Sequence, residues 1–201
     1  PGDWTRRQTF VADNPDDGGD FYLASDQIIL KYVSHYIYTV DKIYLLKNFS
    51  TATAARTALI AAINQGRLVV HYAGHASVQQ WANENLLSAT ALSALTNGNK
   101  LPFFIPMTCL EGYFIWPSGF PVLSMAETAV RINGRGAVAS WSATGYGLTN
   151  GHYYLDESLF GNMFHKFKSQ LGYLTTTAKY DLYARTSSYT APIETYTLFG
   201  D

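Results

Sequence analysis

The chain of 201 residues carries 14 Lys and Arg against 15 Asp and Glu, which leaves a formal net charge of -1. This balance gives no general attraction to nucleic acid or acidic lipid, so it argues against a basic binding module. Apolar residues make up 47% and charged residues only 14%, so the chain can bury one sizeable core. No stretch approaches the length of a membrane span, and the first residues lack the apolar run of a signal peptide.

The chain begins with Pro1 rather than Met, so we expect a piece of a longer, processed protein. Its one cysteine, Cys109, excludes an internal disulfide and a zinc site built from several cysteines. A secreted origin stays open, and the low lysine content with many Tyr, Thr, Ser and Asn favours an extracellular surface.

Short apolar runs alternate with helical patterns along the whole chain, which is typical of an α/β domain with a mostly parallel sheet. The predicted strands cover residues 9–12, 42–46, 68–73, 101–108 and 137–142. Most of these runs are continuously apolar, as expected for strands covered on both faces. The predicted helices cover residues 25–36, 50–64, 88–95, 124–132 and 152–170, with residues 175–187 as a further candidate.

Residues suited to catalysis follow several of the predicted strands. An acidic loop over residues 13–20 comes after the first strand, His75 after the third and Cys109 after the fourth. Because the carboxyl ends of parallel strands meet at one sheet edge, we expect these loops to lie together. A cysteine nucleophile needs an imidazole nearby, and a carboxylate can hold that ring in place. The sequence therefore predicts a cysteine-based site at this edge.

Each of these residues also has a simpler interpretation. Cys109 alone fits a small buried apolar residue, and His75 alone fits a hydrogen-bonded loop histidine. The acidic loop alone fits a solvated turn or a calcium loop, although its spacing does not match an EF-hand. The catalytic hypothesis gains weight because both residues directly follow a buried strand and have small or turn-forming neighbours.

The segments around both residues carry a family resemblance. Residues 68–77 read LVVHYAGHAS, and residues 101–114 read LPFFIPMTCLEGYF. Together with SMAETA at 124–129, GRGAVA at 134–139 and TYTLFGD at 195–201, they resemble the gingipain family of cysteine peptidases, in the caspase-like clan. The resemblance covers nearly the whole chain. It implies an α/β/α caspase-hemoglobinase sandwich, with residues 1–201 as a single peptidase domain cut from a longer multidomain protein.

By this resemblance, Cys109 is the nucleophile and His75 the general acid and base of an endopeptidase. The oxyanion would rest on the backbone N–H groups of Cys109 and Ala76. The family also places an acidic residue on the far side of the histidine. Asp16 and Asp13 both fit that role, with Asp16 preferred.

The resemblance also implies a specificity pocket. Asp26, in the Ser25–Asp26 pair, matches an aspartate that lines this pocket in arginine-specific members, and would select Arg or Lys before the scissile bond. The alternative for this pair is a helix N-terminal cap. Ala73, Met107 and the loop over residues 142–146, with Tyr146, would form the rest of the wall.

Some residues depart from the family pattern. Ala76 replaces a glycine, Thr108 replaces a small residue, and the loop after Cys109 carries Tyr113, Phe114 and Trp116. These departures favour an alternative, an inactive or latent peptidase fold that serves as a binding or adhesion module. A metal-dependent hydrolase is a third hypothesis, which rests on His75, His152, His165 and the acidic loop without close ligand spacing.

The resemblance requires no cofactor and allows a structural calcium ion near the acidic loop. The expected partners are protein or peptide substrates and flanking domains of the same parent chain, with no nucleic acid and no membrane span. The expected location is extracellular or at the surface of a bacterial cell.

Overall fold

A six-stranded sheet forms the centre of the computed structural model, which describes residues 2–115 and 122–200. The strand order is β2-β1-β3-β6-β7-β8, and all neighbours are parallel except β7 and β8. This arrangement confirms the prediction of a mostly parallel sheet. The strands are β1 (Arg7–Ala12), β2 (Thr39–Tyr44), β3 (Val69–Ala73), β6 (Phe103–Met107), β7 (Ala139–Ala143) and β8 (Tyr196–Gly200).

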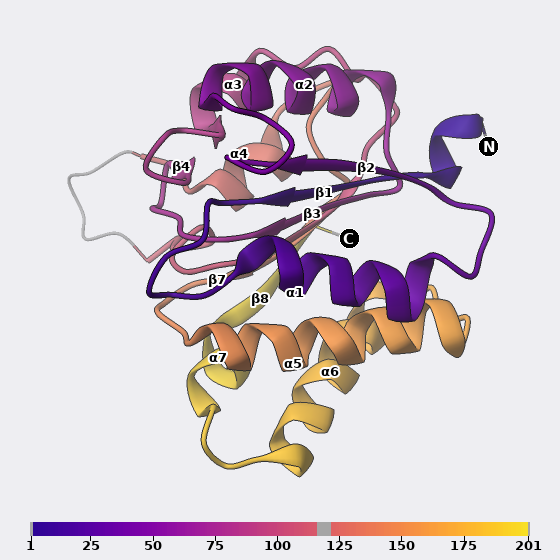
Figure 1. Cartoon of the computed structure of the whole chain (residues 1–201), viewed down its shortest axis with the longest axis vertical. Coiled ribbons are helices and arrows are strands. Elements are labelled where there is room, and N and C mark those ends of the chain that lie inside the picture. Colours follow the sequence, from indigo (N-terminus) through magenta and orange to yellow (C-terminus); the bar gives the residue numbers. More distant parts are fainter. Residues whose placement is uncertain (1, 116–121, 201) are drawn as a thin grey trace.

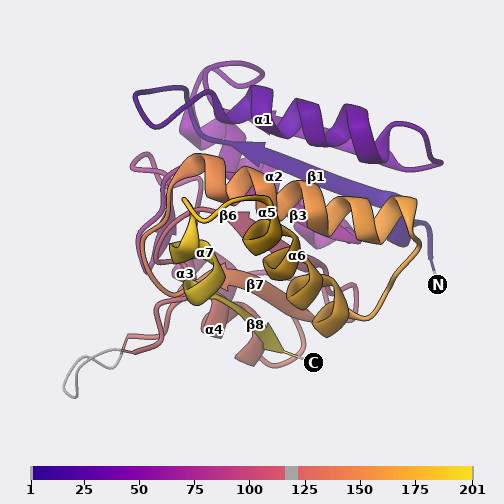
Figure 2. The same cartoon turned by 90° about the horizontal axis from the view of Figure 1, so that it is seen from below.

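Helices cover both faces of the sheet, so the domain has three layers (Figures 1 and 2). One face carries α2 (Ala52–Gln65), α3 (Ala89–Ser93) and α4 (Met125–Arg131). The other face carries α1 (Phe21–Ile28), α5 (Thr149–Phe160) and α6 (Leu171–Arg185). The α/β/α sandwich expected from the sequence is therefore present.

Two apolar cores separate these layers because successive side chains of a strand point to opposite faces. In β1, Phe10 and Ala12 enter the core beneath α1, α5 and α6, whereas Val11 enters the core beneath α2. In β3, Val69 and Ala73 face the first core and Val70 faces the second. Every residue of β3 is buried, which explains its continuous apolar run.

Side-chain caps start several of the helices where the sequence predicted. The Thr51 hydroxyl accepts a hydrogen bond from the Ala54 N–H at the start of α2, and α2 ends at Gly66 with a φ of 95°. At α4, Ser124 and Glu127 form a capping box in which each side chain accepts from the other residue's backbone N–H.

Three predicted helices have clearly different bounds, and one of them is the candidate over residues 175–187, which forms as α6 from Leu171 to Arg185. The helix expected over residues 152–170 ends at Phe160, passes through a π-helical turn η3 (Gly161–His165), and is separated from α6 by a turn in which Phe167 has a φ of 53°. That turn contains no glycine or proline, so the sequence carries no signal for the end of the helix. The helix expected over residues 25–36 starts earlier, at Phe21, and runs through a π-helical turn η2 (Ile29–Val33).

The sequence analysis missed several short elements, and one of them, the edge strand β8 (Tyr196–Gly200), depends on a partner distant in sequence, β7. These are β8, the antiparallel pair β4 (Gln80–Trp81) and β5 (Leu87–Ser88), the helix α7 (Thr190–Thr195) and the 3-10 helix η1 (Asp3–Arg6). Within the described residues, no helix has the length and apolarity needed to cross a membrane.

Candidate active site

The loops that follow β1, β3, β6 and β7 are joined by backbone hydrogen bonds at one edge of the sheet. The Asp13 N–H donates to the carbonyl of Ala73, and the Leu110 N–H donates to the carbonyl of Gly145. The parallel register places these loops side by side, as the sequence predicts.

His75 lies in the loop after β3 and faces the acidic loop after β1. Its Nε2 atom is 3.1 Å from Oδ2 and 3.3 Å from Oδ1 of Asp16, and the imidazole is 52% exposed. The ring packs edge-on against Phe21, with 5.4 Å between centroids. The Gly18 N–H donates a hydrogen bond of 2.7 Å to Oδ1 of Asp16. Since Asp16 contacts Nε2, the other ring nitrogen, Nδ1, is the one available for proton transfer.

Asp13 contacts the backbone of His75 rather than its ring. Its carboxylate accepts hydrogen bonds from the N–H of Asn14 at 2.9 Å and of His75 at 3.3 Å. Burial raises the pKa of Asp13, and these two N–H groups oppose that rise. The Tyr72 hydroxyl donates to the carbonyl of His75 at 2.5 Å. Of the two acidic candidates, Asp16 therefore meets the imidazole, and Asp13 anchors the loop that carries it.

Cys109 is partly buried and lies two residues beyond β6. Its thiol donates to the carbonyl of Gly147 at 3.5 Å, and the Gly147 N–H donates to the sulfur at 3.4 Å. The next residue, Leu110, has a φ of 59°, an uncommon conformation for a non-glycine residue that turns the chain sharply after the cysteine. The sequence analysis gave no role to the Gly147 N–H.

The two expected oxyanion donors are available. Within residues 2–115 and 122–200, the backbone N–H groups of Ala76 and Cys109 donate no hydrogen bond. Ala76 is not among the non-glycine residues of this part of the chain that have a positive φ. Its methyl group therefore causes no backbone strain at a position where the family has glycine.

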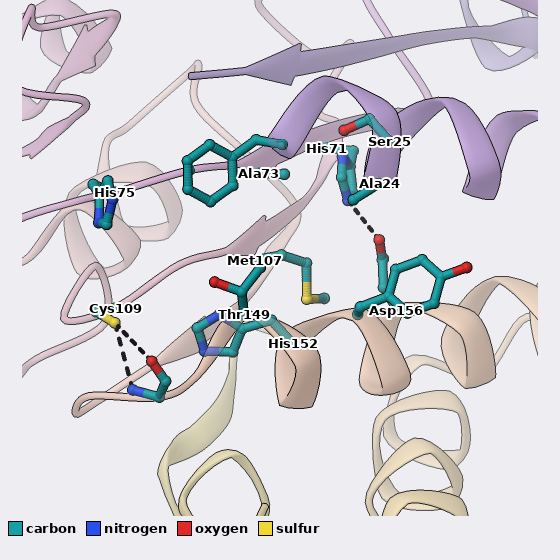
Figure 3. A pocket seen from close by; sticks show the side chains of 14 residues that line it. Ala24, Ser25, His71, Ala73, His75, Met107, Cys109, Thr149, His152 and Asp156 are labelled. Atoms are coloured by element: carbon teal, nitrogen blue, oxygen red, sulfur yellow. Dashed lines mark hydrogen bonds and ion pairs between the residues drawn. The ribbon is translucent and has the colours of Figure 1, made fainter. Parts of the chain in front are cut away.

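One pocket connects His75 and Cys109 with buried side chains that lie between α1 and α5 (Figure 3). His75 and Cys109 lie at one end, and Ser25, His71 and Asp156 lie at the other. The walls include Ala73 and Met107, as the resemblance implies, together with residues that the sequence analysis did not select. These are Phe21, Ala24, Gly74, Gly147, Thr149 and Tyr153. The lining also includes His152, which the sequence analysis named only for the metal hypothesis.

The far end of the pocket contains polar groups that the sequence analysis missed. His71 Nε2 is 2.8 Å from Asp156 Oδ2, and both residues are buried. His152 lies nearer to Cys109, with Nε2 beside Gly147, and burial lowers its pKa to about 4. Two sequence signals point to these residues: His71 precedes Ala73 by two strand positions, and His152 and Asp156 are spaced by four on one helix face.

Asp26 and Tyr146 do not line this pocket. The Asp26 carboxylate lies 2.8 Å from Nζ of Lys42 and accepts a hydrogen bond of 2.7 Å from the Tyr44 hydroxyl, on the side of α1 that faces β2. Tyr146 is 74% exposed and lines a neighbouring groove with Leu148, Tyr189 and Pro192.

Other predicted features lie apart from the pocket or outside the described residues. Phe114 packs on Phe199 of β8, with ring centroids 5.8 Å apart. Trp116 lies outside the described residues. His165 contacts the Lys31 carbonyl, far along the chain from His75. Among the residues that the structure describes, no three His, Cys, Asp or Glu side chains form a group that could hold a metal ion. The structural calcium ion stays a prediction.

The three-layer fold, with a cysteine and a histidine on neighbouring loops at one sheet edge, belongs to the caspase-like class of α/β folds. A family model described as Peptidase family C25 matches residues 1–201, so the chain belongs to that family.

Relatives with curated names are the gingipains of Porphyromonas gingivalis. Gingipain R2 is 28% identical over 115 residues, which are 57% of this chain and 14% of that protein. Lys-gingipain HG66 is 30% identical over 113 residues, which are 56% of this chain and 6% of that protein. The chain therefore spans a small part of the length of these relatives.

Solved structures of gingipains share the fold. The crystal structure of the Arg-specific cysteine proteinase gingipain R superposes with a TM-score of 0.83 and 23% identity, over 98% of this chain and 46% of that one. A complex of the pro- and mature domains of Porphyromonas gingivalis RgpB superposes with a TM-score of 0.80 and 21% identity, over 98% of this chain and 48% of that one. The chain thus corresponds to about half of the solved protein chains.

Proposed function

We propose that the protein is a cysteine endopeptidase in which Cys109 is the nucleophile, His75 the general acid and base, and Asp16 the residue that orients His75. One observation carries the proposal: the sulfur and the imidazole share one end of a single pocket, and a carboxylate occupies the imidazole nitrogen that the reaction does not need. Membership of a peptidase family and the likeness to gingipains support the same activity.

The reaction has two stages in this arrangement. The thiol proton passes to His75, and the sulfur attacks the scissile carbonyl carbon to form a C–S bond. Collapse of the tetrahedral intermediate breaks the C–N bond, and the imidazolium gives its proton to the departing amine. Water then attacks the thioester with His75 as the base, which releases the acid product and restores the thiol.

Backbone groups stabilise the charges that develop on this path. The Gly147 N–H, 3.4 Å from the sulfur, is a backbone donor to the sulfur atom. The unpaired N–H groups of Ala76 and Cys109 are the donors proposed for the oxyanion. Asp16 holds the His75 ring through Nε2, which lies 3.1 Å from its carboxylate.

The remaining aspects of the function are also proposals. We propose protein or peptide substrates, an extracellular or cell-surface location in a bacterium, and residues 1–201 as one peptidase domain of a longer chain. The membership of Peptidase family C25 and the small share of the relatives that this chain spans support these statements.

The test compares Cys109→Ala with the parent protein on a mixture of peptides and with a thiol-directed alkylating reagent. We expect Cys109→Ala to abolish hydrolysis and labelling together. Asp16→Asn should slow hydrolysis by roughly tenfold to a hundredfold, because the ring loses the carboxylate that orients it.

Asp41→Asn is a matched control, because Asp41 pairs with Arg67 at the opposite end of the sheet. Hydrolysis that survives Cys109→Ala would refute the proposal. An intact fold whose Cys109 resists alkylation and shows no hydrolysis would instead favour a latent binding module.

A further inference from the structure

The segment TYTLFGD at residues 195–201 contributes to the family resemblance but has no role in the mechanism described above. Residues 196–200 of this segment form the edge strand β8. Tyr196, its first residue, is fully buried, and its hydroxyl lies next to the end of β6, two strands away in the sheet. Tyr196 therefore brings a polar group from the sheet edge to the segment that carries Cys109.

The pairing of β6 with β7 stops before the carboxyl end of β6. Within the described residues, these two strands pair at two positions, which are Phe103 with Ala139 and Phe104 with Ser140. On its other side, β6 pairs with β3 as far as Met107. The backbone groups of β6 that follow Phe104 and point to β7 therefore lack a partner in the β6–β7 ladder.

Alternation along β6 identifies these backbone groups. The Phe103 N–H donates to the carbonyl of Leu68, so the backbone of Phe103 points to the β3 side. Successive residues of a strand direct their N–H and C=O groups to opposite neighbours, so Pro106, and Thr108 directly after the strand, point to β7. Proline has no N–H, so the groups without a ladder partner are the two carbonyls and the Thr108 N–H.

The Tyr196 hydroxyl contacts all three of these groups. It accepts a hydrogen bond from the Thr108 N–H at 3.2 Å, and it lies 3.1 Å from the carbonyl of Pro106 and 3.3 Å from that of Thr108. A tyrosine hydroxyl both donates and accepts, so one oxygen replaces both kinds of ladder partner. The hydroxyl therefore holds the residue that directly precedes Cys109.

Two buried aromatic neighbours fix the orientation of the Tyr196 ring. Trp141 packs edge-on with 5.1 Å between ring centroids, and His152 packs edge-on from α5 with 5.5 Å. His152 Nε2 also lies beside Gly147, whose N–H and C=O contact the Cys109 sulfur. Tyr196 and His152 together therefore contact both backbone segments that surround the sulfur.

The peptide unit between Thr108 and Cys109 connects this contact to catalysis. Its carbonyl lies 3.3 Å from the Tyr196 hydroxyl, and its N–H is one of the two donors proposed for the oxyanion. A trans peptide unit is planar, and its C=O and N–H point in opposite directions. A hydrogen bond on the carbonyl side therefore also fixes the direction of the Cys109 N–H.

We propose that Tyr196 is the positioning residue of the nucleophile: its hydroxyl sets the Thr108–Cys109 peptide unit, and thereby the places of the sulfur and of the Cys109 N–H. This inference rests on the proposed peptidase function. A misplacement of roughly 1 Å at reacting atoms costs about a hundredfold in rate, so one hydrogen-bonding group behind the nucleophile has a large effect.

The experiment measures kcat and KM of Tyr196→Phe on the peptide that the parent protein hydrolyses best. Phenylalanine keeps the ring between Trp141 and His152 and removes only the hydroxyl. We expect kcat to fall by roughly tenfold to a hundredfold while KM changes by less than about twofold, because the substrate contacts remain and the geometry of attack is lost.

Tyr44→Phe is the matched control. Tyr44 is also buried, and its hydroxyl donates to Asp26 at 2.7 Å, at the end of β2 and outside the pocket. Its kcat should stay within about twofold of the parent protein, since distant sites act independently. Urea denaturation measures the loss of stability in both variants, so a general effect of removing a buried hydroxyl is seen separately.

A peptide aldehyde and the matching peptide alcohol provide a second readout. The thiol adds to the aldehyde carbonyl and forms a C–S bond, whereas the alcohol binds without reacting. Tyr196→Phe should weaken inhibition by the aldehyde by about tenfold or more and leave inhibition by the alcohol unchanged. A merely structural role of Tyr196 would affect both inhibitors alike.

A third readout, hydrogen exchange of the Thr108 amide followed by NMR, requires no turnover. Exchange should be slow in the parent protein and in Tyr44→Phe, and at least about tenfold faster in Tyr196→Phe. Circular dichroism verifies that each variant is folded. If Tyr196→Phe does not fold, the parent protein alone decides: a Thr108 amide that exchanges as fast as an exposed one would overturn the proposal, and a protected one supports it.

The two proposals fail in different ways. Cys109-dependent hydrolysis whose kcat is unchanged in Tyr196→Phe, or falls equally in Tyr44→Phe, would overturn the positioning role and leave the peptidase function standing. Absence of Cys109-dependent hydrolysis on every peptide would overturn the function. In that case the Thr108 amide decides whether Tyr196 anchors the Cys109 segment: faster exchange in Tyr196→Phe alone supports the anchor, and unchanged exchange overturns it.

Discussion

Glu111 makes the stability of the protein depend on pH in a way that one substitution can remove. The residue lies two positions after Cys109, and its side chain is fully buried. Burial raises the pKa of Glu111 from 4.5 to about 7, opposed by the nearby side chains of Ser142 and Trp81. Neither carboxyl oxygen makes a hydrogen bond of good geometry within the described residues, so burial dominates.

The raised pKa of Glu111 fixes the direction and the magnitude of the change in unfolding free energy with pH. A raised pKa in the folded state means that the folded protein binds the proton more tightly than the unfolded chain does. The free energy of unfolding therefore decreases as the pH rises from about 4.5 to about 7, and is flat above that range with respect to this group. At about 1.4 kcal/mol per pKa unit, the total loss is about 3 kcal/mol.

The variant Glu111→Gln has no proton to lose, so we expect its stability relative to the parent protein to rise by about 3 kcal/mol between pH 4 and pH 8. Urea denaturation at a series of pH values measures this difference, and the contributions of all other groups cancel. Glu194→Gln, at an exposed position on α7, is the control and should show no such trend. Parallel stability curves for Glu111→Gln and the parent protein would refute the reasoning.

Two glycines near the site provide further tests. Gly74→Ala should destabilise the fold by roughly 2 to 4 kcal/mol, because Gly74 has a φ of 154° and an added methyl would lie 2.5 Å from the Tyr72 hydroxyl oxygen. Urea denaturation measures this loss, and Gly172→Ala is the control because nothing lies within 4 Å of a methyl added there. Gly147→Ala should slow alkylation of Cys109 by up to about tenfold, since the methyl would collide with His152 Nε2 and displace the Gly147 N–H from the sulfur. An unchanged alkylation rate would show that the Gly147 N–H does not affect the reactivity of Cys109.

The end of the pocket that contains His75 and Cys109 was predictable because its signals are local. Strands buried on both faces read as continuous apolar runs, and a parallel sheet brings the residues after such runs to one edge. His75 and Cys109 directly follow β3 and β6, so their common location follows from strand position alone. The likeness of their flanking segments to gingipains supplied the roles assigned to them.

The polar end of the pocket was not predictable in the same way. Ser25, His71 and Asp156 come from α1, β3 and α5, which are far apart in sequence, and only packing of the two helices on one sheet face brings them together. The rotation of α1 about its axis decides that Ser25 lines the pocket while Asp26 pairs with Lys42. Neighbouring positions on a helix point in directions about 100° apart, so an error of one residue selects a different face.

The sequence by itself determined the class of fold and the sheet edge at which His75 and Cys109 lie, because these depend on periodicity and strand order. Only the tertiary structure decided which of Asp13 and Asp16 contacts the imidazole, and how Gly147 contacts the sulfur. It also decided that the carboxylate of Asp156 lines the pocket. Those outcomes depend on loop conformation and helix rotation, which contacts between distant segments fix and no local pattern encodes.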